Sequence, residues 1–355
     1  MTTRRSAALK RLRAAAAFLP APGALETAVA ALGFVQYDPI RRPARAQDLI
    51  LHQRVRGFLA GDLDRCYPSS KLEEDYFYTY GVLPSAYSEL LHPRGGGSFE
   101  PSGLAAAVLG LLRERGRLTP QEAATTLGRA SETNDWGGVS SATTRALEYL
   151  HYQGFARVSG RLNNRKVYAP RPPVAQSLEP AERLAELTLL MARLLAPVSA
   201  AGLRRALTQL RNNGGALPGN DRVVTDLLHR GALRRDVVEG MTYLTPADSV
   251  PGESRRQVRF LAPFDPVVWD RTRFEHLWGW QYRFEAYTPP KKRQFGYYAL
   301  PLFWGDIAIG WVNLTVEGGA LDVAAGFADT APTGRAFQVA FDAEVTRMEA
   351  MLGLG

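Results

Sequence analysis

Hydrophobic positions recur at helical spacing between residues 104 and 154 and then switch to a strand-like pattern. Leu104 to Arg115 predicts a first amphipathic helix, which ends at Gly116. A second helix opens with Thr119-Pro120-Gln121-Glu122, where threonine is a favourable N-cap, proline suits the first turn and glutamate completes a capping box. A third begins at Ser140 or Ser141 and ends at Gly154. The stretch from Phe155 to Tyr168 predicts a hairpin.

Three helices followed by a hairpin are typical of a winged helix-turn-helix. Winged helices contact DNA by placing the third helix in a groove and the hairpin, or wing, on phosphates. The wing tip is rich in basic and amide side chains, which favours this interpretation over a merely solvated turn. The tip residues are Arg161, Asn163, Asn164, Arg165 and Lys166, and Arg157 adds a further basic side chain earlier on the wing.

The same order of elements is predicted twice more. One copy follows, with helices at 179–195, 199–210 and 222–230 and a hairpin at 232–244 that carries Arg234 and Arg235. The other precedes, with helices at 5–18, 24–32 and 44–59 and a short strand at Gln36–Asp38. We interpret the pattern as a repeat at the scale of whole domains.

The sequence pattern changes after residue 255, where aromatic residues alternate with predicted short strands and tight turns. Strands are predicted at 297–304, 307–316 and 320–324, and a last helix at 337–352. The aromatic residues are interpreted as core, with a base-stacking platform as the alternative. The predicted fold is therefore α+β: three tandem winged helices and a C-terminal antiparallel β-rich domain. The expected domains are residues 1–93, 94–172, 173–250 and 251–355.

Composition narrows the class of partner. The formal net charge is +8 and the isoelectric point is near 9.7, which indicates an anionic partner and most simply nucleic acid. The chain has one cysteine, Cys66, and lacks both a long apolar run and a signal-peptide pattern, so a reduced, cytoplasmic protein without membrane contact is expected. The histidines are scattered, and neither a metal site nor a nucleotide-binding glycine motif is predicted.

The segment Val35-Gln36-Tyr37-Asp38-Pro39-Ile40 carries the candidate chemistry. Pro39 holds Asp38 extended, and in an extended chain residues i and i+2 point to the same side, so Gln36 and Asp38 project together. A carboxylate beside an amide can activate a water or stabilise a cationic transition state. The alternative is a strand end followed by a turn-forming aspartate, because Asp-Pro commonly opens turns.

Three segments give the chain a resemblance to a known family. They are residues 33–40 followed by the arginine-bearing stretch 41–56, then residues 136–148, and then residues 261–271 continuing through 282–289 and 296–301. In these segments, and in order along almost the whole length, the chain resembles the winged-helix DNA glycosylases of the AlkZ/AlkX group. It is most similar to the YcaQ-type AlkX branch, in which Gln-x-Asp replaces Gln-x-Gln.

The resemblance implies a basic scaffold that excises alkylated bases, including N7-alkylguanine, and unhooks interstrand crosslinks. It places Asp38 and Gln36 at the catalytic positions, and it needs no cofactor. The expected partner is double-stranded DNA carrying such lesions, bound by a monomer in the cytoplasm, at the nucleoid during repair. One departure concerns Tyr76-Phe-Tyr-Thr-Tyr80, where the family has an aromatic and histidine signature and this chain has no histidine, which bears on substrate range. The expected DNA-binding residues are Arg41, Arg42, Arg45, Arg54, Arg157, Arg161, Arg165, Lys166, Arg234 and Arg235.

Two other classes of function remain open on the sequence. The first is a non-enzymatic winged-helix DNA-binding protein or transcriptional regulator, although three unlike copies do not suit the paired half-sites of a dimeric regulator. The second is an RNA-binding or scaffold protein in which Gln36 and Asp38 are structural. Loss of the Asp38 charge distinguishes these classes of function from an enzyme, because only an enzyme depends on that charge.

Overall fold

The structure is a computed structural model that describes most of the chain. The described residues are 6–19, 23–66, 71–94, 100–128, 131–133, 139–162, 165–214, 217, 222–249 and 256–354. Asn163, Asn164 and Trp136, which entered the predictions above, lie outside them.

The chain divides into two compact units, each with its own core. The first unit contains residues 1–62, 188–207 and 222–355, and the second contains residues 63–187 and 208–221. Two helices, α9 (Pro180–Leu194) and α10 (Ala200–Gly214), have residues in both units. This grouping is coarser than the four expected domains, and both that division and the number of winged helices stay predictions.

The first unit begins with short helices around one short strand. Ser6 caps the first helix by accepting a hydrogen bond from the Leu9 amide at 3.2 Å. Gly33, with φ of 77°, ends the second helix in the left-handed conformation that glycine adopts without strain. The elements are α1 (Ala7–Ala17), α2 (Leu25–Leu32), β1 (Val35–Gln36) and α3 (Ala46–His52).

A small antiparallel sheet follows in the same unit, with strand order β8-β10-β9. The turn between its long strands is formed by Glu239 and Gly240, both with positive φ, as expected for a tight hairpin. The predicted hairpin and the helix before it are therefore confirmed. The bounds are β8 (Val198–Ser199), α11 (Val223–His229), β9 (Leu233–Val238) and β10 (Met241–Pro246).

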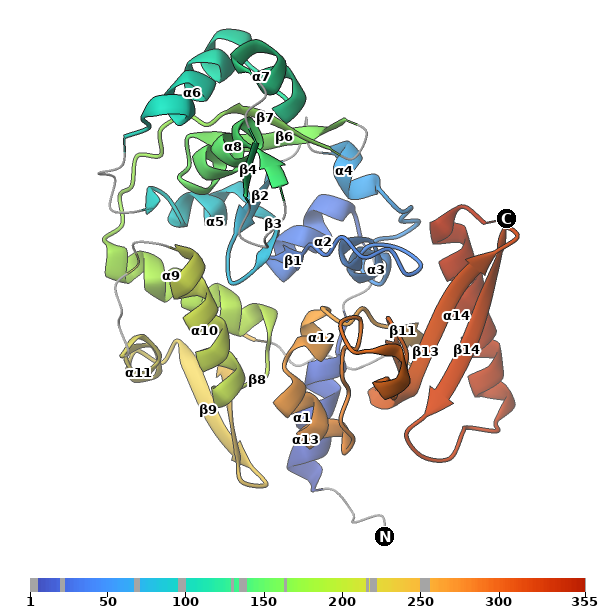
Figure 1. The fold of residues 1–355 in the computed structure, drawn as a ribbon. Coiled ribbons are helices and arrows are strands. Elements are labelled where there is room, and N and C mark those ends of the chain that lie inside the picture. Colours follow the sequence, from blue (N-terminus) through green and yellow to red (C-terminus); the bar gives the residue numbers. More distant parts are fainter. Residues whose placement is uncertain are drawn as a thin grey trace. The chain divides into compact units, whose positions relative to one another are not determined.

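The C-terminal part of the first unit is a four-stranded antiparallel sheet of order β11-β12-β13-β14, with α14 packed against it (Figure 1). Phe274, Trp278 and Phe303 are buried in its aromatic core. The bounds are β11 (Val258–Phe260), α12 (Pro266–Trp269), α13 (Arg271–Trp278), a 3-10 turn (Pro290–Lys292), β12 (Leu300–Trp304), β13 (Ile307–Glu317), β14 (Ala320–Phe327) and α14 (Arg335–Leu352).

The second unit contains the three helices and the hairpin predicted at 104–168. The Thr119–Glu122 capping box is present, with both reciprocal hydrogen bonds. Leu118 pairs with Tyr168 through two backbone hydrogen bonds of 2.8 and 2.9 Å, which joins the hairpin to the helices. The bounds are α6 (Gly103–Arg115), α7 (Pro120–Leu127), α8 (Ala142–Tyr152), β6 (Ala156–Leu162) and β7 (Arg165–Pro170).

A second hairpin in this unit was not predicted from the sequence. Strand β2 (Leu72–Tyr76) pairs antiparallel with β3 (Tyr80–Pro84), and α5 (Ser85–Leu90) follows directly. The remaining elements of the unit are α4 (Asp62–Cys66), β4 (Ser131–Thr133) and β5 (Val139–Ser141).

One predicted helix is shorter than expected. The helix expected at 44–59 ends at His52, because the amides of Arg54 and Val55 both turn back to the Leu51 carbonyl and Gly57 then takes a positive φ. Otherwise the mixed α+β content agrees with the prediction.

Candidate active site

The Gln36–Asp38 segment is held by the residues just before it. Phe34 and Val35 are each 1% exposed, and the amide of Gly33 closes the preceding helix on the Val29 carbonyl at 2.8 Å. Gln36 and Asp38 are both half-buried. The chain therefore anchors its backbone in the core while the two polar side chains stay within reach of solvent.

The Asp38 carboxylate takes part in a local turn through one oxygen, and its other oxygen makes no hydrogen bond within the described residues. Its Oδ1 accepts a hydrogen bond from the Ile40 amide at 2.9 Å, which is the turn that the structural alternative predicted. The Asp38 amide donates to Oε1 of Gln47 on α3 at 3.3 Å. Within the described residues, Oδ2 of Asp38 makes no hydrogen bond, so it remains available to a water or a substrate.

Burial changes the acidity of this carboxyl group. Removal from solvent raises the pKa of Asp38 above its ordinary 3.8, and the hydrogen bond from Ile40 opposes the rise. A carboxylate with a raised pKa is a better proton acceptor than an exposed one.

Polar atoms near Asp38 lack hydrogen-bond partners in the described part of the chain. They are Oε1 of Gln36, Nε2 of Gln47 and the hydroxyl of Tyr298, all of which are buried. The ionised Asp38 also raises the pKa of Tyr298, an effect that comes second to burial. Gln47 and Tyr298 were not identified from the sequence. They lie in different segments from the motif, and no local pattern marks them.

Most of the C-terminal aromatic residues form core, as predicted. Phe274 packs edge-on against Trp280, with ring centroids 5.1 Å apart, and Trp278 packs against Phe303 at 5.1 Å. Tyr287 and Tyr297 are exceptions, with exposed fractions of 84% and 39%, and the ring of Tyr287 lies 6.1 Å from that of Phe284.

The basic residues expected around the motif have different environments. Arg41 and Arg42 are exposed. Arg45 donates to Asp48 at 3.0 Å. Arg54 is buried, and its guanidinium donates to both carboxylate oxygens of Asp265 at 2.7 and 2.9 Å. Arg54 therefore forms a structural ion pair with Asp265, and it is no longer expected to contact DNA.

The predicted wing of the second unit has part of its charge neutralised. Arg161 donates to both oxygens of Glu74 at 2.8 and 2.7 Å, and the ammonium of Lys166 lies 4.0 Å from the ring centroid of Tyr80. Arg157 is half-buried and acts electrostatically on Glu73.

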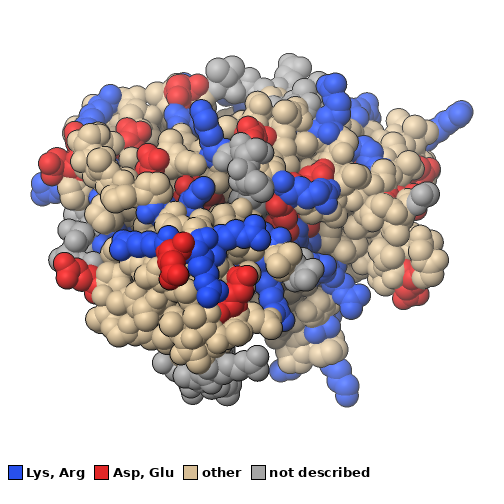
Figure 2. All heavy atoms as spheres, turned by 90° about the horizontal axis from the view of Figure 1, so that it is seen from above, with Lys and Arg blue, Asp and Glu red and all other residues tan. Residues whose placement is uncertain are grey.

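Exposed arginines remain on both predicted wings. Arg165 is exposed beside Gln121, and Arg234 and Arg235 are exposed on β9. Figure 2 shows one face of the molecule on which lysine and arginine side chains gather near the middle, with fewer carboxylates among them. Such a distribution suits a phosphate-bearing partner.

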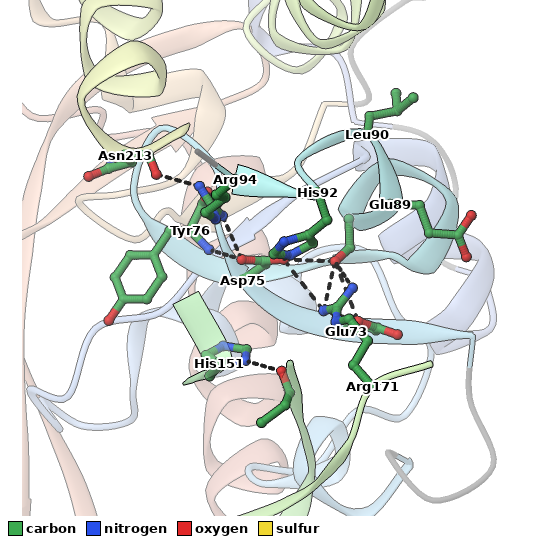
Figure 3. Close-up of polar contacts among 12 residues, drawn as sticks. Glu73, Asp75, Tyr76, Glu89, Leu90, His92, Arg94, His151, Arg171 and Asn213 are labelled. Carbon is green, nitrogen blue, oxygen red and sulfur yellow. Dashed lines mark hydrogen bonds and ion pairs between the residues drawn. The ribbon is translucent and has the colours of Figure 1, made fainter. Parts of the chain in front are cut away.

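A second cluster of titratable groups lies in the second unit, around Asp75 on β2 (Figure 3). The carboxylate of Asp75 is fully buried and contacts Nε2 of His92 at 2.7 Å, a guanidinium nitrogen of Arg94 at 2.7 Å and the hydroxyl of Ser88 at 2.8 Å. Burial by itself raises the pKa of Asp75, but the charges of His92 and Arg94 outweigh it and hold the pKa well below 3.8.

We interpret the Asp75 cluster as a buried network of ion pairs and hydrogen bonds that stabilises the fold, and not as a reactive site. Arg171 joins it through Glu73 and the Ser88 hydroxyl, and Arg94 continues to the backbone carbonyls of Tyr76 and Asn213. All these side chains except Glu73 are at most 7% exposed. His92 thus contacts Asp75 on β2 and is itself enclosed.

Neither a metal site nor a membrane span is found in the described part of the chain. Among these residues, no group of three or more histidine, cysteine, aspartate or glutamate side chains is arranged to hold a metal ion. No helix in the described ranges is both long enough and apolar enough to cross a membrane.

Comparisons with known proteins agree with this architecture. The family model described as DNA glycosylase AlkZ-like matches residues 29–351. The fold is similar to the solved structure of the Streptomyces sahachiroi DNA glycosylase AlkZ, with a TM-score of 0.61 and 15% sequence identity. That match covers 98% of this chain and 95% of the other. At this identity the likeness to the solved structure concerns the fold alone.

Proposed function

Because the chain belongs to the AlkZ-like DNA glycosylase family, we propose that it is a monofunctional DNA glycosylase for alkylated bases. Its substrates are N7-alkylguanine in duplex DNA and the interstrand crosslinks built from that lesion. The Gln-x-Asp motif supports the further proposal that it belongs to the YcaQ-type AlkX branch. The observation that carries the proposal is the half-buried Asp38 carboxylate, which keeps one oxygen available beside Gln36.

The chemistry of the lesion fits a carboxylate acting on water. An N7-alkylguanine is already cationic, so it leaves readily and little protonation of the base is needed. The deoxyribose then passes through an oxocarbenium-like transition state, as in other glycoside hydrolysis. Asp38 stabilises this positive charge and accepts a proton from the attacking water.

Gln36 complements Asp38 as a neutral hydrogen-bonding group. Its buried Oε1 lacks a partner among the described residues and can accept a hydrogen bond from the water or from the sugar. Water as the nucleophile leaves an abasic site and an intact strand, which defines a monofunctional enzyme.

The first experiment is excision from a duplex that carries one N7-alkylguanine. The expected product is an abasic site, so the labelled strand breaks only after alkali. A break before alkali would contradict the monofunctional mechanism. Tight binding without any excision would instead favour a non-enzymatic DNA-binding protein.

The pH dependence follows from the raised pKa of Asp38. Asp38 must be ionised to act, so the excision rate should fall as the pH drops through its pKa. Because burial raises that pKa, the acid limb should lie above 3.8. Single-turnover rates on the cationic lesion give this limb directly, since the base requires no protonation. A flat profile down to pH 4 would contradict the role of Asp38.

The proposed DNA contacts predict a dependence on salt. Replacing exposed Arg234 and Arg235 together by glutamine should weaken duplex binding and reduce the slope of log K against log salt by up to about 2, since each phosphate contact contributes about one counterion. The measurement is fluorescence anisotropy at several salt concentrations. Arg335→Gln, an exposed arginine at the start of α14, is the control. An unchanged slope in the double variant would remove β9 from the interface.

A further inference from the structure

Unpartnered polar groups gather around Asp38. A buried donor or acceptor without a partner costs about 1–3 kcal/mol, so proteins rarely keep one unless water or a ligand satisfies it. Here Oε1 of Gln36, Nε2 of Gln47 and the hydroxyl of Tyr298 all lack partners in the described part of the structure. Gln36 is two residues from Asp38, and Gln47 accepts a hydrogen bond from the Asp38 amide. The charge of Asp38 acts on Tyr298, so a bound molecule beside Asp38 would give these groups partners.

Tyr298 is held rigidly from several sides. It is 3% exposed, and its ring packs edge-on against Phe284, with centroids 5.4 Å apart. The next residue, Ala299, accepts a hydrogen bond from the Tyr282 hydroxyl at 2.6 Å and leads into strand β12. The position of the Tyr298 hydroxyl is therefore determined by the sheet and its core.

The loop before Tyr298 is fixed by a buried carboxylate. Glu285, 5% exposed, accepts hydrogen bonds from the amides of Gln294, Phe295 and Gly296, the shortest at 2.7 Å. Gly296 has φ of 127°, and a side chain there would meet Asn313, so the sequence needs glycine at this point. Such a preorganised support is typical of a group that must hold a reactant in place.

Tyr298 also has the protonation state that a positioning group requires. Burial and the charge of Asp38 both raise its pKa above 10.0, so the hydroxyl keeps its proton at working pH. No hydrogen bond joins the two side chains within the described atoms, although the charge of Asp38 acts on the Tyr298 hydroxyl. A water between them would satisfy both.

We propose that Tyr298 is a positioning residue whose hydroxyl holds the attacking water against Asp38. This inference rests on the proposed glycosylase function. The Tyr298 hydroxyl donates one hydrogen bond to the water, and the water donates to Oδ2 of Asp38 and to Oε1 of Gln36. One lone pair of the water then remains for the sugar.

The step balances without any further reactant. The water oxygen forms a bond to C1′ of the deoxyribose while the bond from C1′ to N9 of the base breaks. The electron pair of that bond neutralises the cationic base, and the proton of the water passes to Asp38. Tyr298 keeps its own proton and only orients the nucleophile.

Tyr298→Phe tests this role, because it removes the hydroxyl and keeps the ring packing. The single-turnover excision rate at saturating enzyme should fall about 10- to 100-fold, while the Kd for lesion-bearing duplex is unchanged. The melting temperature should stay the same or rise, since a buried group without a partner is removed.

Tyr243→Phe, on β10, is the matched control. It also removes one buried tyrosine hydroxyl, but that hydroxyl already has a partner in Nδ1 of His276 at 2.7 Å. The control should lower the melting temperature and leave the excision rate within about twofold of wild type.

The outcomes separate the two proposals. If wild type excises, Asp38→Asn does not and Tyr298→Phe matches wild type in rate, the role of Tyr298 is wrong and the glycosylase function stands. If wild type itself does not excise the lesion, the proposed function fails. A rate loss in Tyr298→Phe that is accompanied by an equal loss in Tyr243→Phe would mean a structural effect and would also overturn the inference.

Discussion

Asp38→Asn is expected to reduce the excision rate of N7-alkylguanine by about 10²- to 10⁴-fold, the contribution typical of a positioned general base. The amide keeps the shape of the side chain and can still accept the hydrogen bond from the Ile40 amide. It has no negative charge for the oxocarbenium and does not take a proton from water. The measurement is a single-turnover assay with alkaline cleavage of the product strand.

In Asp38→Asn, DNA binding and the melting temperature should not fall along with the excision rate. The Gln47 contact involves the backbone amide of residue 38 and is therefore preserved. Burial disfavours the ionised carboxyl, so the neutral amide should leave the melting temperature unchanged or slightly higher. Asp342→Asn, on the exposed side of α14, is the control and should behave as wild type. Retention of more than a tenth of the wild-type rate in Asp38→Asn would show that the charge is dispensable.

Local signals in the sequence predicted much of the fold. The capping box at Thr119–Glu122, the glycine stops at Gly33 and Gly116 and the turn at Glu239–Gly240 all depend on residues that are neighbours in the chain. Their geometry follows from backbone chemistry alone, without knowledge of the tertiary structure. For the same reason the helices and hairpins that they delimit could be placed to within a few residues.

The hairpin β2–β3 shows the limit of local patterns. Glu73-Glu74-Asp75 is a run of like charges, which alone suggests an exposed segment. In the structure all three are buried, because arginines from distant segments neutralise them: Arg171 pairs with Glu73, Arg161 with Glu74 and Arg94 with Asp75. These pairings span up to 98 positions in the sequence, and no local pattern indicates them.

The candidate site was predictable only in part. The spacing of Gln36 and Asp38, with Pro39 after them, predicts that the two side chains share a direction. This stays a prediction, because the strand includes Gln36 but ends before Asp38. The surroundings of Asp38 could not be predicted from the motif, since Gln47 comes from the next helix and Tyr298 from the C-terminal sheet region. Arg54 shows a different limit of the sequence. Its charge made it an expected DNA contact, but in the structure it forms a buried ion pair with Asp265.

The second large effect is expected for Asp75→Asn, which removes the negative centre of the buried cluster in the second unit. Arg94 and Arg171 would remain enclosed with less compensating charge, and breaking such a buried pair typically costs about 3–5 kcal/mol in the free energy of unfolding. Denaturant unfolding at pH 7 measures the total loss. Hydrogen exchange of the β2 amides localises it to this unit.

The pH dependence of stability tests whether the lost charge of Asp75 causes the destabilisation. The folded pKa of Asp75 lies below its ordinary 3.8, so its contribution is present above that value and is lost as the pH falls through the folded pKa. The stability difference between wild type and Asp75→Asn should therefore narrow as the pH falls below 3.8. Asp322→Asn, exposed on β14, supplies the control at each pH. A difference that stays constant at low pH would mean that packing of the amide, and not the lost charge, destabilises the variant.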